Sequence, residues 1–322
     1  MFKKPNCPVI ALEEHYADAE LIKHYTGPDA AREGEAMKRL LDLGALRLKE
    51  MDEAGIDIQV LSHGAPSTQK LGKDVAAAVT RGINDRLHQA IKANPVRFAG
   101  FAALPTADPA AAADELERCV RELGFRGAML HGLANGTFLD DKQFWPIYER
   151  AEKLDVPIYL HPGYPDDRVV GAYYQDYAKD FPQLLRAGWG YTVETATLAI
   201  RLVLSGVFEK YPKLQFILGH LGETLPFLVW RVDMALARPG AAQHAGFRDV
   251  FCKHFQVTTS GFFSNPALLC CVMELGIDRI LFAVDWPFVA NAPGPRWMEQ
   301  VPLCDEDKAK ILSGNARRLL KM

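Results

Sequence analysis

The chain of 322 residues lacks long apolar runs and lacks a strong excess of charge of either sign. No apolar run reaches the roughly 18 residues that a membrane span needs, so we expect no contact with a bilayer. Lysine and arginine total 37 against 40 acidic residues, a formal net charge of −3. That balance provides no basic face for a nucleic acid. No apolar segment stands between the N-terminal lysines and the first predicted strand, which argues against a signal peptide.

Paired cysteines are also absent. The six cysteines are scattered along the chain, and no two have the C-x-x-C spacing. In a chain of this size, such a pattern is typical of reduced thiols rather than of a disulfide framework. We therefore expect a cytoplasmic protein without structural disulfides.

What the sequence does contain is a large apolar content and a repeating order of elements. Hydrophobic residues make up 49% of the chain, enough for one large core and a single domain over residues 1–322. Short apolar runs alternate with segments of helical spacing eight times. The predicted strands are 8–15, 56–62, 98–104, 127–131, 157–161, 214–219, 256–260 and 280–285.

The predicted helices follow the strands, and each is bounded by ordinary start and stop signals. Asp108 and Pro109, for example, begin one helix as its N-cap and first residue, and Gly124 ends it. The helices are 36–54, 73–94, 109–123, 141–154, 190–210, 224–237, 265–275 and 305–320. An insertion rich in Tyr, Asp, Gly and Pro occupies 162–188, and residues 238–254 are predicted to be irregular.

This alternation predicts a (β/α)8 TIM barrel. A doubly wound open sheet is the alternative, and it requires a glycine-rich phosphate turn directly after the first strand. Here the first strand is followed by the residues EEHY, and no glycine occurs before Gly27. The sequence therefore favours the barrel.

Polar side chains stand where the predicted strands end, which is where barrel enzymes carry their active sites. These residues are Glu13, His15, His63, His131, His161, His220, Ser260 and Asp285. Packing alone does not explain such a series, because every buried polar group must find a partner.

Four of these residues suit a metal ion. Glu13 and His15 are two residues apart on one strand and so point to the same face, whereas Glu14 points outward to the helices. With His161 and Asp285 they form a set of two nitrogen and two oxygen ligands, which suits one divalent ion, Zn²⁺ or Mn²⁺. A single strand-terminal histidine is more often a hydrogen-bonded structural group, and Asp285 alone would cap a turn. The joint pattern favours the metal.

His220 and Glu223 form a second candidate pair. Glu223 at the start of a helix would interact favourably with the helix dipole, but it would also orient His220 toward a substrate, and we favour this second interpretation. Arg231 would hold a substrate anion or pair with a carboxylate such as Asp233. His63 and His131 would contact substrate or bond to a loop carbonyl. The sequence leaves these alternatives open.

Several stretches of the chain are similar to one known family. The chain resembles the metal-dependent decarboxylases of the amidohydrolase superfamily, which include the γ-resorcylate, 2,3-dihydroxybenzoate and 5-carboxyvanillate decarboxylases. The stretches are ALEEH (11–15), RFAGFAALP (97–105), EKLDVPIYLHP (152–162), ILGHLGE (217–223), WRVD (230–233), TTSG (258–261), DRILFAVDWPF (278–288) and NARRL (315–319).

The resemblance implies roles for individual residues. It gives the metal ligands as Glu13, His15, His161 and Asp285, and His220 with Glu223 as the supporting pair. His131 stands where the resorcylate-type enzymes often carry asparagine; with no bridging lysine at that strand end, the resemblance implies a mononuclear site. The residues expected near the substrate are His63, His131, Arg231, Trp286 and Phe288, together with aromatic residues of 163–190.

The resemblance also implies an activity. We expect non-oxidative decarboxylation of a small hydroxylated aromatic acid, with the metal holding the carboxylate and the neighbouring hydroxyl group and Asp285 protonating the ring carbon. The alternative is a lactonase or amidohydrolase that uses a metal-bound water, because the same ligands serve both reactions. The family further implies a homodimer or homotetramer.

Overall fold

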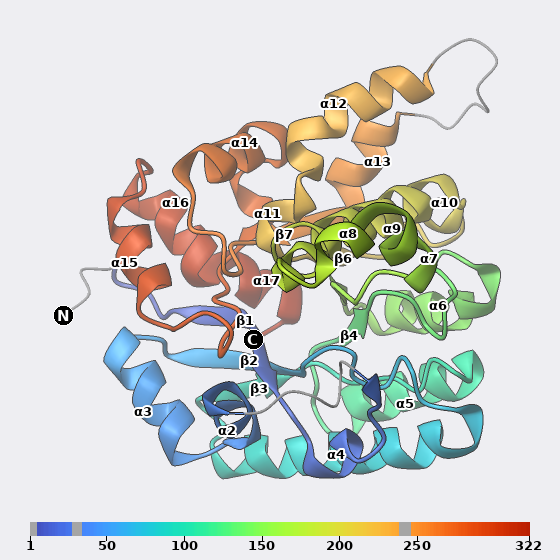
Figure 1. Cartoon of the computed structure of the whole chain (residues 1–322). Coiled ribbons are helices and arrows are strands. Elements are labelled where there is room, and N and C mark those ends of the chain that lie inside the picture. The colour runs from blue at the N-terminus through green and yellow to red at the C-terminus, as the bar shows by residue number, and fades with distance from the viewer. Residues whose placement is uncertain (1–4, 28–33, 238–245) are drawn as a thin grey trace.

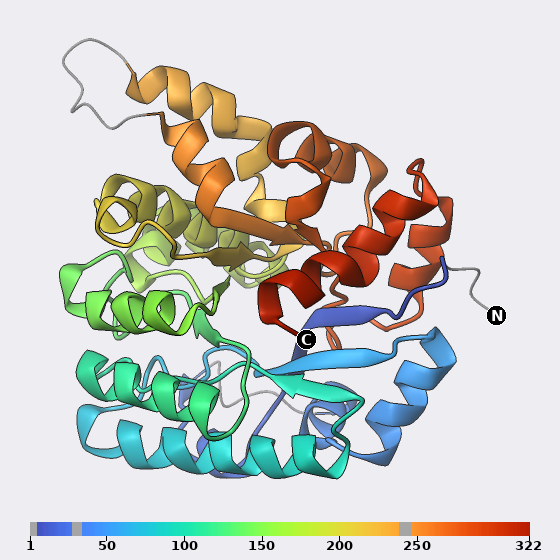
Figure 2. The same cartoon turned by 180° about the vertical axis from the view of Figure 1, so that it is seen from behind.

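A computed structural model describes residues 5–27, 34–237 and 246–322, and within them the chain forms a (β/α)8 barrel. The strands lie at the centre of the molecule, and the helices surround them (Figure 1 and, from behind, Figure 2). All strand pairs are parallel. The strands are β1 (Ile10–Tyr16), β2 (Ile58–His63), β3 (Phe98–Gly100), β4 (Ala128–His131), β5 (Ile158–His161), β6 (Phe216–Leu218), β7 (Phe255–Thr258) and β8 (Ile280–Leu281).

Two seams join the sheet β1-β2-β3 to the sheet β4-β5-β6-β7-β8 and close the barrel. At the first, Ala102 after β3 bridges to Ala128 of β4. At the second, the backbone after β8 runs beside β1: the Asp285 N–H donates to the Glu13 carbonyl at 3.0 Å, and the His15 N–H donates to the Trp286 carbonyl at 2.7 Å. Because β8 itself is short, these bonds fix Asp285 next to the end of β1.

The long helices cover the outside of the barrel. They are α3 (Ala45–Ala54), α4 (Lys73–Ala93), α5 (Pro109–Arg121), α6 (Trp145–Leu154), α9 (Gly190–Leu204), α12 (Leu225–Leu236), α13 (Phe247–His254), α14 (Asn265–Leu275) and α15 (Pro293–Gln300). The short ones are α1 (Ala19–Ile22), α2 (Glu35–Leu41), α7 (Asp167–Val169), α8 (Gln175–Ala178), α10 (Val207–Lys210), α11 (His220–Glu223), α16 (Asp305–Ala309) and α17 (Asn315–Leu320). No helix in the described ranges is long and apolar enough to cross a membrane.

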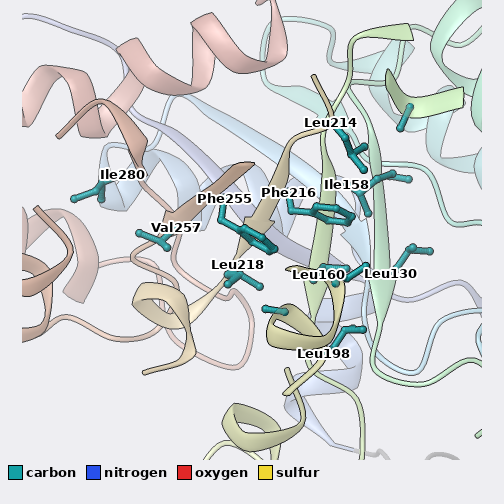
Figure 3. Close-up of a cluster of buried hydrophobic side chains, with 14 of the residues drawn as sticks. Leu130, Ile158, Leu160, Leu198, Leu214, Phe216, Leu218, Phe255, Val257 and Ile280 are labelled. Atoms are coloured by element: carbon teal, nitrogen blue, oxygen red, sulfur yellow. The ribbon is translucent and has the colours of Figure 1, made fainter. Parts of the chain in front are cut away.

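Alternation along the strands separates two apolar layers, apart from an irregularity in β1 between Ala11 and Glu14. One set fills the barrel and is closed by residues of α17: it contains Ile10, Leu12, Val60, Phe101, Met129, Tyr159, Ile217 and Leu281, with Ala316 and Leu320. The other set lies between strands and helices. Figure 3 shows part of it, where Leu130, Ile158, Leu160, Phe216 and Phe255 of neighbouring strands pack together.

Several predicted boundaries were wrong. The predicted helix 36–54 is two helices, because the Asp42 carboxylate accepts hydrogen bonds from the N–H groups of Gly44 and Arg47 and so begins α3. The predicted helix 190–210 is divided by Gly206, whose φ is 84°. The prediction for 238–254 is wrong for Phe247–His254, which is helical, and its first eight residues lie outside the described ranges. The 162–188 insertion contains α7 and α8.

Candidate metal and active site

Four side chains meet at the C-terminal ends of the barrel strands. Glu13 and His15 come from β1, His161 from the last position of β5, and Asp285 from the segment after β8. One ligand atom from each lies within 4.8 Å of the other three. His15 Nε2 is 3.3 Å from Asp285 Oδ1, and His161 Nε2 is 3.2 Å from Glu13 Oε1. The structure thus brings together the four residues predicted as ligands.

The hydrogen bonding of this group indicates that something binds at its centre. Glu13 Oε1, His15 Nε2 and Asp285 Oδ1 are buried and have no hydrogen-bond partner in the described part of the chain. Buried polar atoms of this kind are costly unless a partner satisfies them. Two carboxylate oxygens and two imidazole nitrogens are donors that suit one divalent metal ion.

Residues of neighbouring strands hold the Glu13 carboxylate in place. The Tyr159 hydroxyl donates to Glu13 Oε2 and lies 2.8 Å from the Thr258 hydroxyl. Gly219 lies so close that a Cβ atom there would be 2.7 Å from Glu13 Oε2. Glycine at 219 is therefore required by the position of the carboxylate.

His131 orients His161. The Nδ1 atoms of the two rings are 3.0 Å apart, and His161 Nδ1 is also 2.8 Å from the carbonyl oxygen of Pro162. Burial, followed by the charge of nearby His161, holds the pKa of His131 well below its usual range and so favours its neutral ring. Because Nδ1 of His161 contacts His131 and the Pro162 carbonyl oxygen, Nε2 of His161 faces Glu13. His131 therefore supports a ligand and does not line the cavity described below.

His220 lies on an unusual backbone segment. Residues 220–224 all have positive φ, between 48° and 78°, a conformation that side chains other than glycine rarely adopt. The segment turns His220 toward the ligand group, with Nε2 3.7 Å from Glu13 Oε1 and 3.9 Å from Asp285 Oδ2. Its Nδ1 is 2.7 Å from Glu223 Oε1, and Thr192 donates to the other Glu223 oxygen at 2.8 Å.

The charges in the site stabilise one another. Burial acts against the imidazolium form, but Asp285 and Glu13 raise the pKa of His15 to about 9. Burial also opposes the charge of His220, yet Glu223 and Glu13 hold its pKa well above the usual range. In turn, these histidines hold the pKa of Asp285 below its usual value despite burial. Because a metal ligand must be a free base, binding of the ion displaces protons from this group.

A cavity of about 630 Å³ opens onto these residues, within the size range of small-molecule sites. Its polar lining includes His161, His220, Asp285, Gln183, Arg186 and Tyr191. The remainder is apolar: Ala36, Met37, Leu40, Ala65, Ala187, Pro287, Phe288 and Val289. The Phe288 ring, predicted from the resemblance to lie near the substrate, is 5.7 Å from the ring of His15.

Three other predicted substrate contacts do not line this cavity. Trp286 is fully buried; its Nε1–H donates to Glu50 at 2.7 Å, and the Arg47 guanidinium covers its ring. His63 uses Nε2 to accept from the Asp18 N–H and lies 2.8 Å from the Gly64 carbonyl oxygen through Nδ1. Both residues therefore make contacts within the fold rather than with this cavity.

Arg231 is exposed on α12, and Asp233, its predicted partner, accepts instead from the N–H of Arg248. The exposed aromatic residues of the insertion, Tyr173, Tyr177 and Phe181, are likewise absent from the cavity lining.

Tyr159, Thr192 and Arg186 were not predicted as site residues from the sequence. Tyr159 had a usable signal, because it precedes His161 by two residues on one strand and so faces the barrel interior with it. Arg186 had none, because the insertion shows no periodicity from which a direction could be assigned.

Comparison with known proteins gives a consistent result. The family model described as "Amidohydrolase" matches residues 15–322. The chain is 41% identical to a γ-resorcylate decarboxylase of Polaromonas sp. over 97% of this chain and 98% of the relative. A solved Polaromonas dihydroxybenzoic acid decarboxylase with manganese and 2-nitroresorcinol has a TM-score of 0.89 at 40% identity, covering 98% and 97% of the two chains.

A second solved structure is similar at lower identity. It is 5-carboxyvanillate decarboxylase of Novosphingobium aromaticivorans, complexed with manganese and 4-hydroxy-3-methoxy-5-nitrobenzoic acid. Its TM-score is 0.92 at 30% identity, and the match covers 100% of this chain and 99% of that one.

Proposed function

The chain belongs to the amidohydrolase family and is a metal-dependent decarboxylase of aromatic acids, and we propose that its substrate is a small benzoate with a hydroxyl group beside the carboxylate. The observation that supports this most directly is the convergence of buried donor atoms without partners at the end of an otherwise largely apolar cavity. The aromatic ring of such a substrate fits the apolar walls of the cavity, and its carboxylate and hydroxyl group fit the metal site formed by these donor atoms.

Glu13, His15, His161 and Asp285 are the proposed ligands of one divalent ion, and Mn²⁺ is our choice over Zn²⁺ because the two similar structures contain manganese. When bound, the ion supplies positive charge that holds the substrate carboxylate and its neighbouring hydroxyl oxygen. The protein around it fixes the ring in one orientation, with Phe288 along one wall.

The residues of the chain supply the proton. In the reaction the ring carbon that bears the carboxylate takes a proton, and the ring loses its aromaticity. The bond from that carbon to the carboxylate then breaks, CO₂ leaves, and the electron pair of the broken bond restores the aromatic ring. We assign that proton transfer to Asp285, which lines the cavity. Because the neighbouring histidines lower its pKa despite burial, Asp285 must first take up a proton from one of them. His220 is 3.9 Å from Asp285 Oδ2 and is oriented by Glu223, so it is placed to return a proton to Asp285 after each turnover.

The experiment measures CO₂ release by the manganese-loaded protein from 2-hydroxybenzoate, 2,3-dihydroxybenzoate and 2,6-dihydroxybenzoate. We expect release from at least one of them, and a loss of about 100-fold or more in Asp285→Asn, because general acid catalysis contributes that much. Asp176→Asn, at an exposed position of the insertion, is the matched control and should be as active as wild type.

A parallel assay of lactone hydrolysis separates the two reactions that these ligands can support. Lactone hydrolysis without CO₂ release would overturn the decarboxylase. Near-normal CO₂ release by a folded Asp285→Asn protein would remove Asp285 from the role of proton donor.

We also propose that the protein is a cytoplasmic homodimer or homotetramer. Support for self-association comes from α12, where Phe227 and Trp230 expose 80% and 63% of their surface, a large apolar area for one helix. Support for the cytoplasm comes from the six cysteines, all of which are free. Light scattering of wild type and Trp230→Glu tests the assembly: a smaller species is expected for the variant, and a monomeric wild type would overturn the proposal.

A further inference from the structure

The cavity carries a charged group that the proposed reaction does not use. Arg186, in the insertion after β5, lines it together with Gln183 and Tyr191. The proposed ligands come from β1, β5 and the segment after β8. The cavity therefore has two positively charged places for an anion: the metal site, and Arg186 on a different element.

No group in the described part of the chain accepts a hydrogen bond from the Arg186 guanidinium. Arg186 is half-buried, and in the described part of the chain neither a carboxylate nor a carbonyl accepts a hydrogen bond from it. The guanidinium instead lies over the Tyr164 ring, with Cζ 5.9 Å from the ring centroid. Every other half-buried arginine in the described ranges has an acceptor. Arg118, for example, donates to Asp85 at 2.7 Å and to Glu115.

This difference indicates a ligand rather than a structural role. A guanidinium is always charged and carries five N–H donors that match a carboxylate in shape. Removing it partly from water without an acceptor is unfavourable. The Arg186 side chain also stabilises no other described residue by a hydrogen bond. It is thus free to bind an anionic group of whatever enters the cavity.

We propose that the substrate carries a second carboxylate, which Arg186 binds, so that the preferred substrates are hydroxybenzene dicarboxylates. The inference rests on the proposed decarboxylase function: one carboxylate is held at the metal site and leaves as CO₂, and the other stays on the ring against Arg186. A neutral hydroxyl group in place of this carboxylate would bind the guanidinium more weakly, because hydrogen bonds between two charged groups are stronger than those to neutral acceptors.

The first experiment compares diacids with a matched monoacid. The diacids are 2-hydroxybenzoate carrying a further carboxylate at ring position 3, 4 or 5, and 2-hydroxybenzoate itself is the monoacid. For the wild type we expect kcat/KM for the best diacid to exceed that for the monoacid by about tenfold to a hundredfold, the effect of one charge-assisted hydrogen bond. Arg186→Gln should remove that preference through a higher KM for the diacid, and Arg186→Lys should keep part of it.

Arg168→Gln is the matched control. Arg168 belongs to the same insertion, but its side chain is 86% exposed, is paired with Asp166 at 2.8 Å and does not line the cavity. Its substitution should leave the preference for diacids unchanged. Because the Arg186 side chain makes no hydrogen bond to any residue that the structure describes, Arg186→Gln should unfold at the same temperature as wild type.

The second experiment measures binding without turnover. Calorimetry compares 2-nitrophenol with 4-hydroxy-3-nitrobenzoate, in which a nitro group replaces the carboxylate that would leave. Wild type should bind the nitrobenzoate at least tenfold more tightly, and Arg186→Gln should bind the two compounds equally.

The outcomes separate this inference from the function on which it rests. If neither monoacids nor diacids release CO₂, the decarboxylase is wrong, and the binding experiment still reports on Arg186. If monoacids release CO₂ but no diacid is preferred, or if Arg186→Gln weakens monoacids and diacids equally, the second carboxylate is wrong.

Discussion

Glu13 and Glu14 are neighbours in the sequence, identical in type and equally buried, yet they lie in opposite environments. Glu13 points into the barrel, and its Oε1 has no hydrogen-bond partner in the described ranges. Glu14 points outward and is fully engaged: its carboxylate accepts from the N–H groups of Val284 and Trp286, at 2.9 and 3.2 Å, and from Gln59 at 3.3 Å. One face of β1 is arranged for a ligand and the other for the fold.

The hydrogen bonds on the outer face of β1 also affect the position of Asp285, which belongs to the metal site on the inner face. The two N–H groups that Glu14 accepts from belong to the residues on either side of Asp285, which has a positive φ of 71°. On the same face, Arg47 donates to the His15 carbonyl and to Gln59. Burial raises the pKa of Glu14 to about 8 against these bonds. The outer cluster of Glu14, Arg47 and Gln59 therefore joins β1 to the segment that carries Asp285.

The largest effect is expected for Glu13→Gln. The variant replaces a charged ligand by a neutral amide among histidines that favour a negative charge, so it should bind little metal and lose CO₂ release by at least about 100-fold. Metal content per chain, measured by elemental analysis after dialysis, is the readout. A variant that keeps one metal ion per chain would show that Glu13 is not a ligand.

The matched change on the outer face, Glu14→Gln, should act on stability instead. It places an amide NH₂ against backbone N–H donors, which should lower the free energy of unfolding by about 1–3 kcal/mol. Metal content should remain close to that of wild type. Denaturant unfolding with metal analysis of the folded protein provides both numbers. If Glu14→Gln lost its metal as completely as Glu13→Gln, the conclusion that only the inner face of β1 serves metal binding would be wrong.

The smallest effect is expected for Trp286→Phe. The change removes the hydrogen bond to Glu50 and part of the ring under Arg47, at a cost of about 1 kcal/mol in stability. KM should change less than twofold, since Trp286 does not line the cavity. Phe288→Ala, which does shorten a cavity wall, should raise KM. A rise in KM for Trp286→Phe equal to that for Phe288→Ala would restore Trp286 as a substrate contact.

Much of this comparison could be predicted before the fold was known. The two-residue period of a strand placed Glu13 and His15 on one face and Glu14 on the other, and strand ends in a barrel are gathered at one rim. The identities of the ligand set and of the His220–Glu223 pair follow from the same reasoning together with the family resemblance. These are features of single strands, and short-range patterns are sufficient to find them.

Residues outside the strands could not be placed in this way. Trp286 follows Asp285 directly, but whether it faces the cavity or α3 depends on the path of the chain after β8. His63 ends a strand as His161 does, yet the backbone around it occupies both of its nitrogens. In each case the partner is 45 or more residues away, or depends on a turn that the sequence does not specify.

The sequence by itself determined the barrel, the faces of its strands and the donors at their ends, because these depend on periodicity and on local residue type. Only the tertiary structure decided which of the strand-end residues support others, as His131 supports His161, and which segment covers the donors. Arg186 is the clearest case. Its place in the cavity depends on how an insertion without periodicity folds back over the barrel, and that is set by long-range packing.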